Sequence, residues 1–183
     1  MFTVKGLQPG GPIELGDGPG RARAPAPRWL EIAAQELGVS QHPPGQSNPR
    51  ITQYHDGTNI CGYDDKASWC SSFVNWCLTH AGWAGTGNAL ARSWLSWGRP
   101  LKDPVPGCVV VLWRDDPGAW RGHVGFFLRA EADRLVLLGG NQLGQVRAHG
   151  YPRAQLLGLR WPEVRCCGSP PAYARSTTHG EPE

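Results

Sequence analysis

Cys70 and His123 have residue types and neighbours that suit nucleophilic catalysis. Cys70 lies near the start of a segment with helical apolar spacing, for which Ser68 is a suitable N-cap. Free backbone N–H groups and the helix dipole at such a position stabilise a thiolate and lower its pKa. His123 begins a predicted strand, and Gly122 and Gly125 leave its imidazole uncrowded. Because a thiolate beside an imidazole is the activated nucleophile of acyl transfer, the pair indicates thiol chemistry.

Asn141 is the predicted third member of this group. A catalytic imidazole needs a polar partner on its second ring nitrogen. Asn141 ends the strand that we expect to pair with the strand of His123, and ordinary hairpin register places the two residues at the same end of the sheet. The sequence leaves structural alternatives open, namely a buried small side chain for Cys70, an edge histidine for His123 and a turn residue for Asn141.

The cysteine pattern gives no sign of a metal site or a disulfide framework. Three of the cysteines lie inside apolar periodic segments, which favours reduced, buried thiols. No Cys-x-x-Cys pair and no Cys/His spacing of a zinc site occurs among the six, which are Cys61, Cys70, Cys77, Cys108, Cys166 and Cys167. We therefore expect neither a metal ion nor an organic cofactor, and the adjacent Cys166 and Cys167 receive no assigned role.

The hydrophobic period changes along the chain from helical to strand-like spacing. Helices are predicted over 27–38, 68–82 and 88–97, with a short helical turn over 50–54. Strands are predicted over 108–113, 123–129, 134–138, 146–149 and 157–161. Helices followed by an antiparallel sheet define an α+β fold.

Composition excludes several classes of protein. With 40% hydrophobic and 18% charged residues among 183, the chain is not a coiled coil, a collagen or a wholly disordered protein. We expect one domain over 28–162, between a flexible leader (1–27) and a flexible tail (163–183). A net charge of +3 without a Lys/Arg run argues against a nucleic-acid partner. We find neither a transmembrane stretch nor a signal peptide at the N-terminus.

Four short motifs occur together in one order, and their combination is more specific than any one of them. They are WCSSFVNWC (69–77), ARSW (91–94), GHVGF (122–126) and GGNQ (139–142). Together they resemble the NlpC/P60–CHAP superfamily of papain-like cell-wall peptidases, in particular its small bacterial and phage branch. The resemblance implies a papain-like α+β core, with Cys70 as nucleophile, His123 as general base and Asn141 as third polar residue. The chain has Trp69 where many relatives have aspartate.

The resemblance also implies a function. We expect hydrolysis of a peptidoglycan stem-peptide amide bond, by an endopeptidase or an N-acetylmuramoyl-L-alanine amidase, without a cofactor. Substrate binding is assigned to Trp69, Ser71, Trp94 and Gly122. We expect a monomer, made in the cytoplasm and delivered to the wall by a holin or a secretion system, with a cognate immunity protein or delivery machinery as partner. The alternatives are a cysteine protease acting on protein, a binding module without turnover, and a structural protein.

Overall fold

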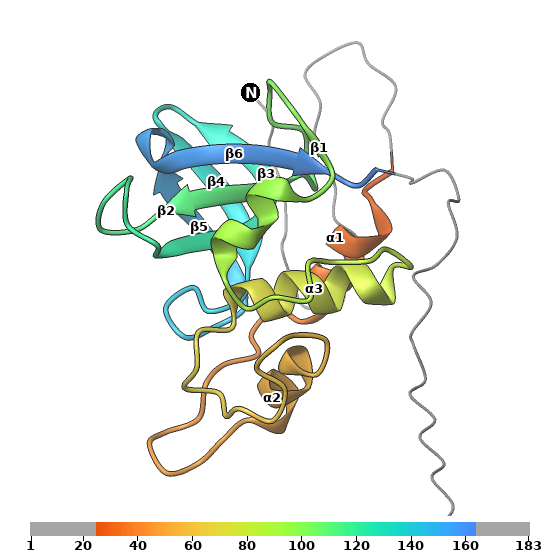
Figure 1. The fold of residues 1–183 in the computed structure, drawn as a ribbon, viewed down its shortest axis with the longest axis vertical. Coiled ribbons are helices and arrows are strands. Elements are labelled where there is room, and N and C mark those ends of the chain that lie inside the picture. The colour runs from red at the N-terminus through yellow and green to blue at the C-terminus, as the bar shows by residue number, and fades with distance from the viewer. Residues whose placement is uncertain (1–24, 164–183) are drawn as a thin grey trace, which may run out of the picture.

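Helices precede an antiparallel sheet in this protein, as the computed structural model of residues 25–163 shows (Figure 1). The α-helices are α1 (Arg28–Gln35), α2 (Pro49–His55) and α3 (Cys70–His80), and the 3-10 helix η1 (Ala91–Ser96) follows them. The predicted α+β class is therefore confirmed. Residues 1–24 of the predicted leader and 164–183 of the predicted tail lie outside the described residues. No helix within 25–163 is long and apolar enough to cross a membrane.

The sheet has six strands in the order β1-β6-β2-β3-β4-β5, and every pairing is antiparallel. The 3-10 helix η2 (Arg153–Gln155) connects the strand at one edge, β5, to β6 near the other edge. Trp113 at the end of β2 donates a hydrogen bond from Nε1 to the Ala154 carbonyl at 3.1 Å. The sheet therefore curls, so that the end of β5 returns towards β2. The strands are β1 (Arg99–Pro100), β2 (Val109–Trp113), β3 (Gly122–Glu131), β4 (Arg134–Gly139), β5 (Arg147–Pro152) and β6 (Leu156–Trp161).

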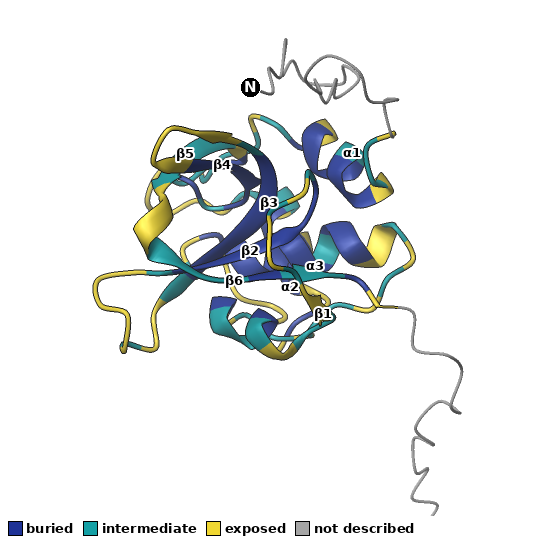
Figure 2. Cartoon of the chain, turned by 90° about the horizontal axis from the view of Figure 1, so that it is seen from above, coloured by how far each residue is buried: buried dark blue, intermediate teal, exposed yellow. Residues whose placement is uncertain are grey.

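Both faces of the sheet carry buried apolar side chains. Figure 2 shows that much of β2, β3 and β4 is buried. Since side chains alternate along a strand, Val124 and Phe126 of β3 face the helices and join a core cluster with Phe73 of α3. The other face carries a second buried cluster, which includes Leu112 and Phe127. His123 lies directly opposite Leu112 in the ladder of β2 and β3, so it projects on this second face.

The observed helix starts differ from the predicted ones. Helix α3 begins at Cys70 itself, and its N-cap is Trp69, which makes no side-chain capping bond. Ser68 is therefore not the cap. The predicted helix 88–97 is the shorter 3-10 helix η1, because the Asn88 side chain accepts a hydrogen bond from the Leu90 N–H at 2.8 Å and forms a turn there.

A polar network centred on the buried Glu36 joins the end of α1 to α2. The Glu36 carboxylate accepts hydrogen bonds from Arg50 Nε at 2.8 Å and from the Tyr54 hydroxyl at 2.6 Å. The Tyr54 ring in turn packs on Trp69, with ring centroids 5.9 Å apart. Because Trp69 is the N-cap of α3, this network packs against the start of that helix.

Candidate active site

Cys70 is the first residue of α3, and its side chain is 5% exposed. The backbone N–H groups of Ser71 and Val124 lie near enough to its sulfur to lower the pKa of the thiol. Since Val124 follows His123 directly, this contact brings the thiol to the start of β3. Burial raises the pKa of the Cys70 thiol, and the two N–H groups and the charge of Arg114 lower it without overcoming the burial. The expected lowering at the helix start is therefore not found, because the thiol is enclosed.

His123 is held by an amide side chain on one of its ring nitrogens. The imidazole is 3% exposed, and its Nε2 lies 3.3 Å from Gln142 Oε1. The Gln142 amide nitrogen donates to the Leu137 carbonyl at 3.2 Å and also to the Arg147 carbonyl, so Oε1 is the atom that faces the imidazole. Because Oε1 can only accept, His123 carries its proton on Nε2, and its Nδ1 is available as a base.

The structure thus gives His123 a different partner from the predicted Asn141. Continuing the register of Phe126 with Leu138 would set Asn141 opposite His123, but β4 ends at Gly139. Asn141 has a φ of 56°, and this left-handed turn brings Gln142 into the buried position. Asparagine adopts this conformation more readily than most residues, and that preference is the signal by which the sequence could have distinguished the two.

Replacing Gln142 by leucine tests this assignment against its neighbour. The variant loses a hydrogen bond to an imidazole that becomes charged during turnover, so we expect kcat to fall about 10- to 100-fold, with a smaller change in KM. The matched control is Asn141→Gly, which removes the side chain while glycine tolerates the positive φ. The kcat of the control should stay within about twofold of the wild-type value. Steady-state kinetics of both variants measure the two effects. A larger loss of kcat for Asn141→Gly than for Gln142→Leu would indicate that Asn141, as predicted from the sequence, is the residue that orients His123.

Tyr151 is a site residue that the sequence analysis missed. Its ring packs against the His123 imidazole, with centroids 4.9 Å apart and planes 31° from parallel. Burial raises the pKa of Tyr151 well above its ordinary value, so the phenol stays neutral. Tyr151 reaches His123 only because the sheet curls, and no local motif signals that contact.

Trp69 lies inside the core and not on an exposed wall of a cleft. Its side chain is wholly buried between Tyr54 and the loop after β4. A Cβ atom at Gly140 would lie 2.6 Å from the Trp69 ring, so only glycine fits there. The predicted role of Trp69 in substrate binding would need an exposed indole face, which this structure does not provide.

The other predicted binding residues also pack around the start of α3. Trp94 is wholly buried, and its Nε1 donates to Ser71 Oγ at 2.8 Å. Ser71 Oγ donates to the Asn88 carbonyl at 2.6 Å. Gly122 is half-buried beside His123, and a Cβ atom there would lie 2.8 Å from the Leu112 carbonyl oxygen. These contacts position the helix and the strand, and of the four residues only Gly122 lies next to the imidazole with part of its backbone exposed.

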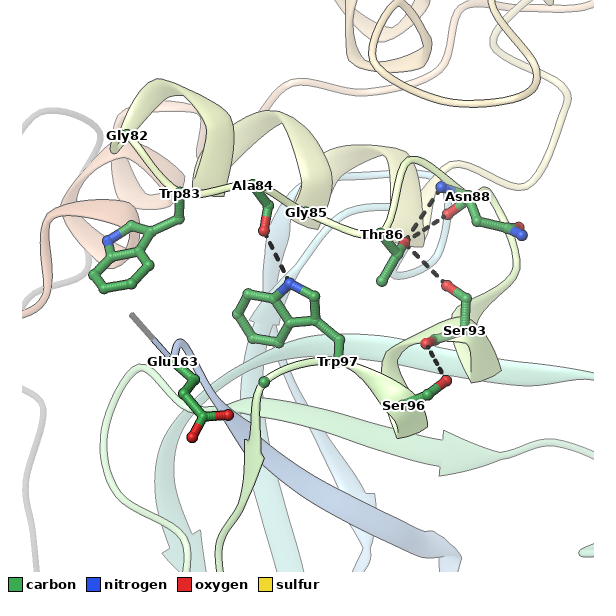
Figure 3. Close-up of a pocket in the computed structure, with 11 residues that line it drawn as sticks. Gly82, Trp83, Ala84, Gly85, Thr86, Asn88, Ser93, Ser96, Trp97 and Glu163 are labelled. Atoms are coloured by element: carbon green, nitrogen blue, oxygen red, sulfur yellow. Dashed lines mark hydrogen bonds between the residues drawn. The ribbon is translucent and has the colours of Figure 1, made fainter. Parts of the chain in front are cut away.

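A pocket of about 870 Å³ lies beside α3 but away from its first residue (Figure 3). The indoles of Trp83 and Trp97 and the carboxylate of Glu163 border it, and Trp97 Nε1 donates to the Ala84 carbonyl at 2.9 Å. Neither Cys70 nor His123 lines the pocket. Asn88 lines the pocket and also contacts the start of α3, because its carbonyl accepts a hydrogen bond from Ser71 Oγ. The lining residues are Gly82, Trp83, Ala84, Gly85, Thr86, Asn88, Ser93, Ser96, Trp97, Gly98 and Glu163.

The remaining described cysteines do not join the site. Cys61, Cys77 and Cys108 are free thiols, and burial raises the pKa of Cys108 to about 12. Within residues 25–163, no group of three or more His, Cys, Asp and Glu side chains is arranged to hold a metal ion.

Acid should destabilise the protein through His123. Burial lowers the pKa of its imidazole to about 4, from the value of 6.5 that applies in an unfolded chain. Between these values the unfolded chain binds a proton that the folded protein does not, so stability falls as pH falls from 6.5 towards 4. We expect a loss of about 3 kcal/mol from this residue across that window.

Denaturant unfolding at several pH values measures this dependence. The His123→Ala variant should lose about 3 kcal/mol less stability than the wild type over the same range. His55, whose pKa is also lowered by burial, contributes in the same direction in both proteins. An unchanged acid dependence in the variant would contradict the assignment of this proton to His123.

A helix that begins with cysteine and packs on an antiparallel strand that begins with Gly-His is the arrangement of papain-like thiol hydrolases. Residues 62–141 match the family model of the CHAP domain, which confirms the resemblance to the NlpC/P60–CHAP superfamily. The match includes Cys70 and His123 and ends one residue before Gln142. CHAP domains are generally cysteine-dependent amidohydrolases, and the family implies amidase or peptidase activity on peptidoglycan.

One solved structure that the chain matches comes from Staphylococcus aureus subsp. aureus Mu50 and is described as similar to a lipoprotein of the NLP/P60 family. It is 14% identical in sequence, with a TM-score of 0.43. The match covers 74% of this chain and 41% of that one, so the chain spans less than half of that protein's length. Comparison with curated protein sequences found no significant match.

Proposed function

We propose that this protein hydrolyses an amide bond of the peptidoglycan stem peptide, as an endopeptidase or an N-acetylmuramoyl-L-alanine amidase, with Cys70, His123 and Gln142 as its catalytic group. The observation that carries the proposal is that the His123 imidazole is held in one orientation by Gln142. Gln142 Oε1 accepts a hydrogen bond from His123 Nε2 and leaves Nδ1 unprotonated. The backbone N–H of Val124, the residue that follows His123, lies near enough to Cys70 to lower the pKa of its thiol. Catalysis by a cysteine nucleophile requires an oriented base of this kind near the thiol.

The mechanism starts from a neutral pair, because burial raises the pKa of Cys70 and lowers that of His123. As the sulfur attacks the substrate carbonyl, His123 Nδ1 takes the thiol proton. The imidazolium that forms is stabilised by Gln142 Oε1, and the Cys70 backbone N–H at the start of α3 donates to the oxyanion.

The imidazolium then gives its proton to the leaving amine, the carbon–nitrogen bond breaks and a thioester with Cys70 remains. His123 next removes a proton from water, which attacks the thioester, and the same proton returns to the departing sulfur. The carboxyl product leaves, and the neutral pair is restored.

Digestion of purified sacculi tests the function. We expect the wild type to release fragments whose new amine and carboxyl ends, found by mass spectrometry, identify the bond. Cys70→Ala should release none, while the exposed Cys61→Ala serves as the matched control and should behave as the wild type. Absence of release by the wild type from several peptidoglycan chemotypes would refute the proposal. Cleavage of casein in preference to sacculi would favour a protease that acts on protein.

A second candidate function is a module that binds cell-wall peptides without turnover. The enclosure of both site residues favours it, since Cys70 is 5% and His123 3% exposed. The separate pocket of Figure 3 would then be a place for a ligand. This reading predicts that Cys70→Ala keeps the full biological effect of the wild type.

Delivery to the wall, by a holin or a secretion system, is part of the proposal. Expression of the wild type without export should leave host cells intact, and expression behind a cleavable export signal should lyse them. Equal lysis with and without the export signal would contradict the proposal that the protein acts on the cell wall after delivery. Cys70→Ala behind the same signal controls for toxicity of export itself.

A further inference from the structure

Two arginines lie on the sheet face that carries His123. The last ladder pair of β2 and β3 is Trp113 with Gly122, and the Arg114 N–H then bonds to the Arg121 carbonyl at 3.4 Å. Arg114 lies two residues after Leu112, the direct partner of His123. Since side chains alternate along a strand, Arg114 projects on the same face as Leu112 and His123. It is the diagonal neighbour of His123, a separation of about 7–8 Å that a long side chain spans.

Arg147 reaches this face from the opposite side. It pairs with Gly139 on β4. It lies four residues before Tyr151 on β5, so its side chain is on the same face as the Tyr151 ring, which covers the His123 imidazole. The Arg147 carbonyl also accepts a hydrogen bond from the Gln142 amide that holds His123. The two guanidinium groups thus come from strands on either side of the catalytic imidazole.

Neither arginine is neutralised within the described part of the chain. Arg114 and Arg147 are exposed, and no carboxylate of residues 25–163 forms a salt bridge with either. Arg121, in the same turn as Arg114, differs because it pairs with Asp115 at 3.3 Å.

The field at the imidazole is accordingly positive. The charged groups that lower the pKa of His123 are Arg114 and His149, and those that lower the pKa of His149 are Arg147 and Arg134. A site with two guanidinium groups that form no salt bridge within residues 25–163 suits a carboxylate ligand, which arginine binds in a bidentate fashion.

We propose that Arg114, supported by Arg147, binds a carboxylate of the substrate, so that the enzyme selects stem peptides with a free carboxyl group beside the bond that it cleaves. The inference rests on the proposed function and names its substrate class. In stem peptides the second residue, a γ-linked glutamate, carries this carboxyl group either free or amidated. It lies within two residues of the N-acetylmuramoyl-L-alanine bond and next to the peptide bonds on either side of it, so it is the group we assign to Arg114.

The experiment uses two soluble muropeptides that differ only in whether this carboxyl group is free or amidated. We expect the wild type to prefer the free acid in kcat/KM by about 10- to 100-fold, the usual strength of a charge-assisted bond. In Arg114→Gln the ratio of the two kcat/KM values should fall to near one, and Arg114→Lys should keep part of it. The matched control is Arg121→Gln, which should retain the wild-type ratio.

Calorimetric binding of the same two muropeptides to Cys70→Ala, with and without Arg114→Gln, separates this inference from the proposed function. A preference for the free acid that Arg114→Gln abolishes supports the inference even if the wild type cleaves neither peptide, and in that case only the proposed function falls. Equal binding and equal cleavage of the two peptides by the wild type overturns the inference. A preference that survives in Arg114→Gln overturns it as well.

Discussion

His123→Ala is expected to lower kcat/KM for muropeptide hydrolysis by about 10²- to 10⁴-fold, the usual contribution of a positioned general base. The reason is specific to this site. Burial raises the pKa of the Cys70 thiol, so the proposed mechanism requires His123 Nδ1 to remove the thiol proton before the sulfur attacks. Alkylation of Cys70 by iodoacetamide gives a second readout, and it should slow in the variant near neutral pH.

The matched control is His55, the second buried histidine among residues 25–163. Its Nδ1 accepts from Ser72 Oγ at 2.9 Å, and its Nε2 donates to the Asp64 carbonyl at 3.2 Å, so its contacts are structural. His55→Ala should lower the stability but leave kcat/KM per folded molecule close to that of the wild type. Equal losses of kcat/KM in the two variants would refute a catalytic role for His123.

Trp69→Ala is expected to destabilise the protein by about 3–5 kcal/mol, as truncation of a buried tryptophan does. The indole is wholly buried against Tyr54 and fills the space that Gly140 leaves open. Trp69→Phe retains part of this packing, so we expect a smaller loss of stability and an unchanged KM. Denaturant unfolding and steady-state kinetics measure the two effects separately.

Trp120 provides the control for this prediction, because its side chain is 71% exposed. Trp120→Ala should change the free energy of unfolding by no more than about 0.5 kcal/mol. If Trp69→Phe left stability intact and raised KM, Trp69 would contact the substrate, as its assignment from sequence proposes.

The elements that carry Cys70 and His123 could be predicted because their signals are local. Apolar residues at helical spacing define the segment after Cys70, and alternating valines and phenylalanines define the strand after His123. Strand β1 was not predicted, since two residues show no period and it exists only by pairing with β6. Helix α2 was predicted as a shorter turn, and its true length reflects packing on α3.

The partner of His123 was predicted one residue away from its position. Strand register places Asn141 opposite His123, and register is a property of two regular strands. The left-handed turn at Asn141 ends that regularity, and the Leu137 and Arg147 carbonyls then fix the Gln142 amide. Both carbonyls come from strands whose relative placement no local pattern specifies.

The amino-acid sequence alone determined the α+β class and the family resemblance, and it proposed Cys70 and His123 as the reacting pair, because residue type and spacing suffice for these inferences. Only the tertiary structure decided that Gln142 holds His123, that Tyr151 covers it and that Trp69 is core. It also reversed the expected direction of the Cys70 pKa shift. The physical reason is that burial and cross-strand contacts depend on how the sheet curls and how α3 docks on it, and the free energy of enclosing a thiol exceeds what a helix start contributes.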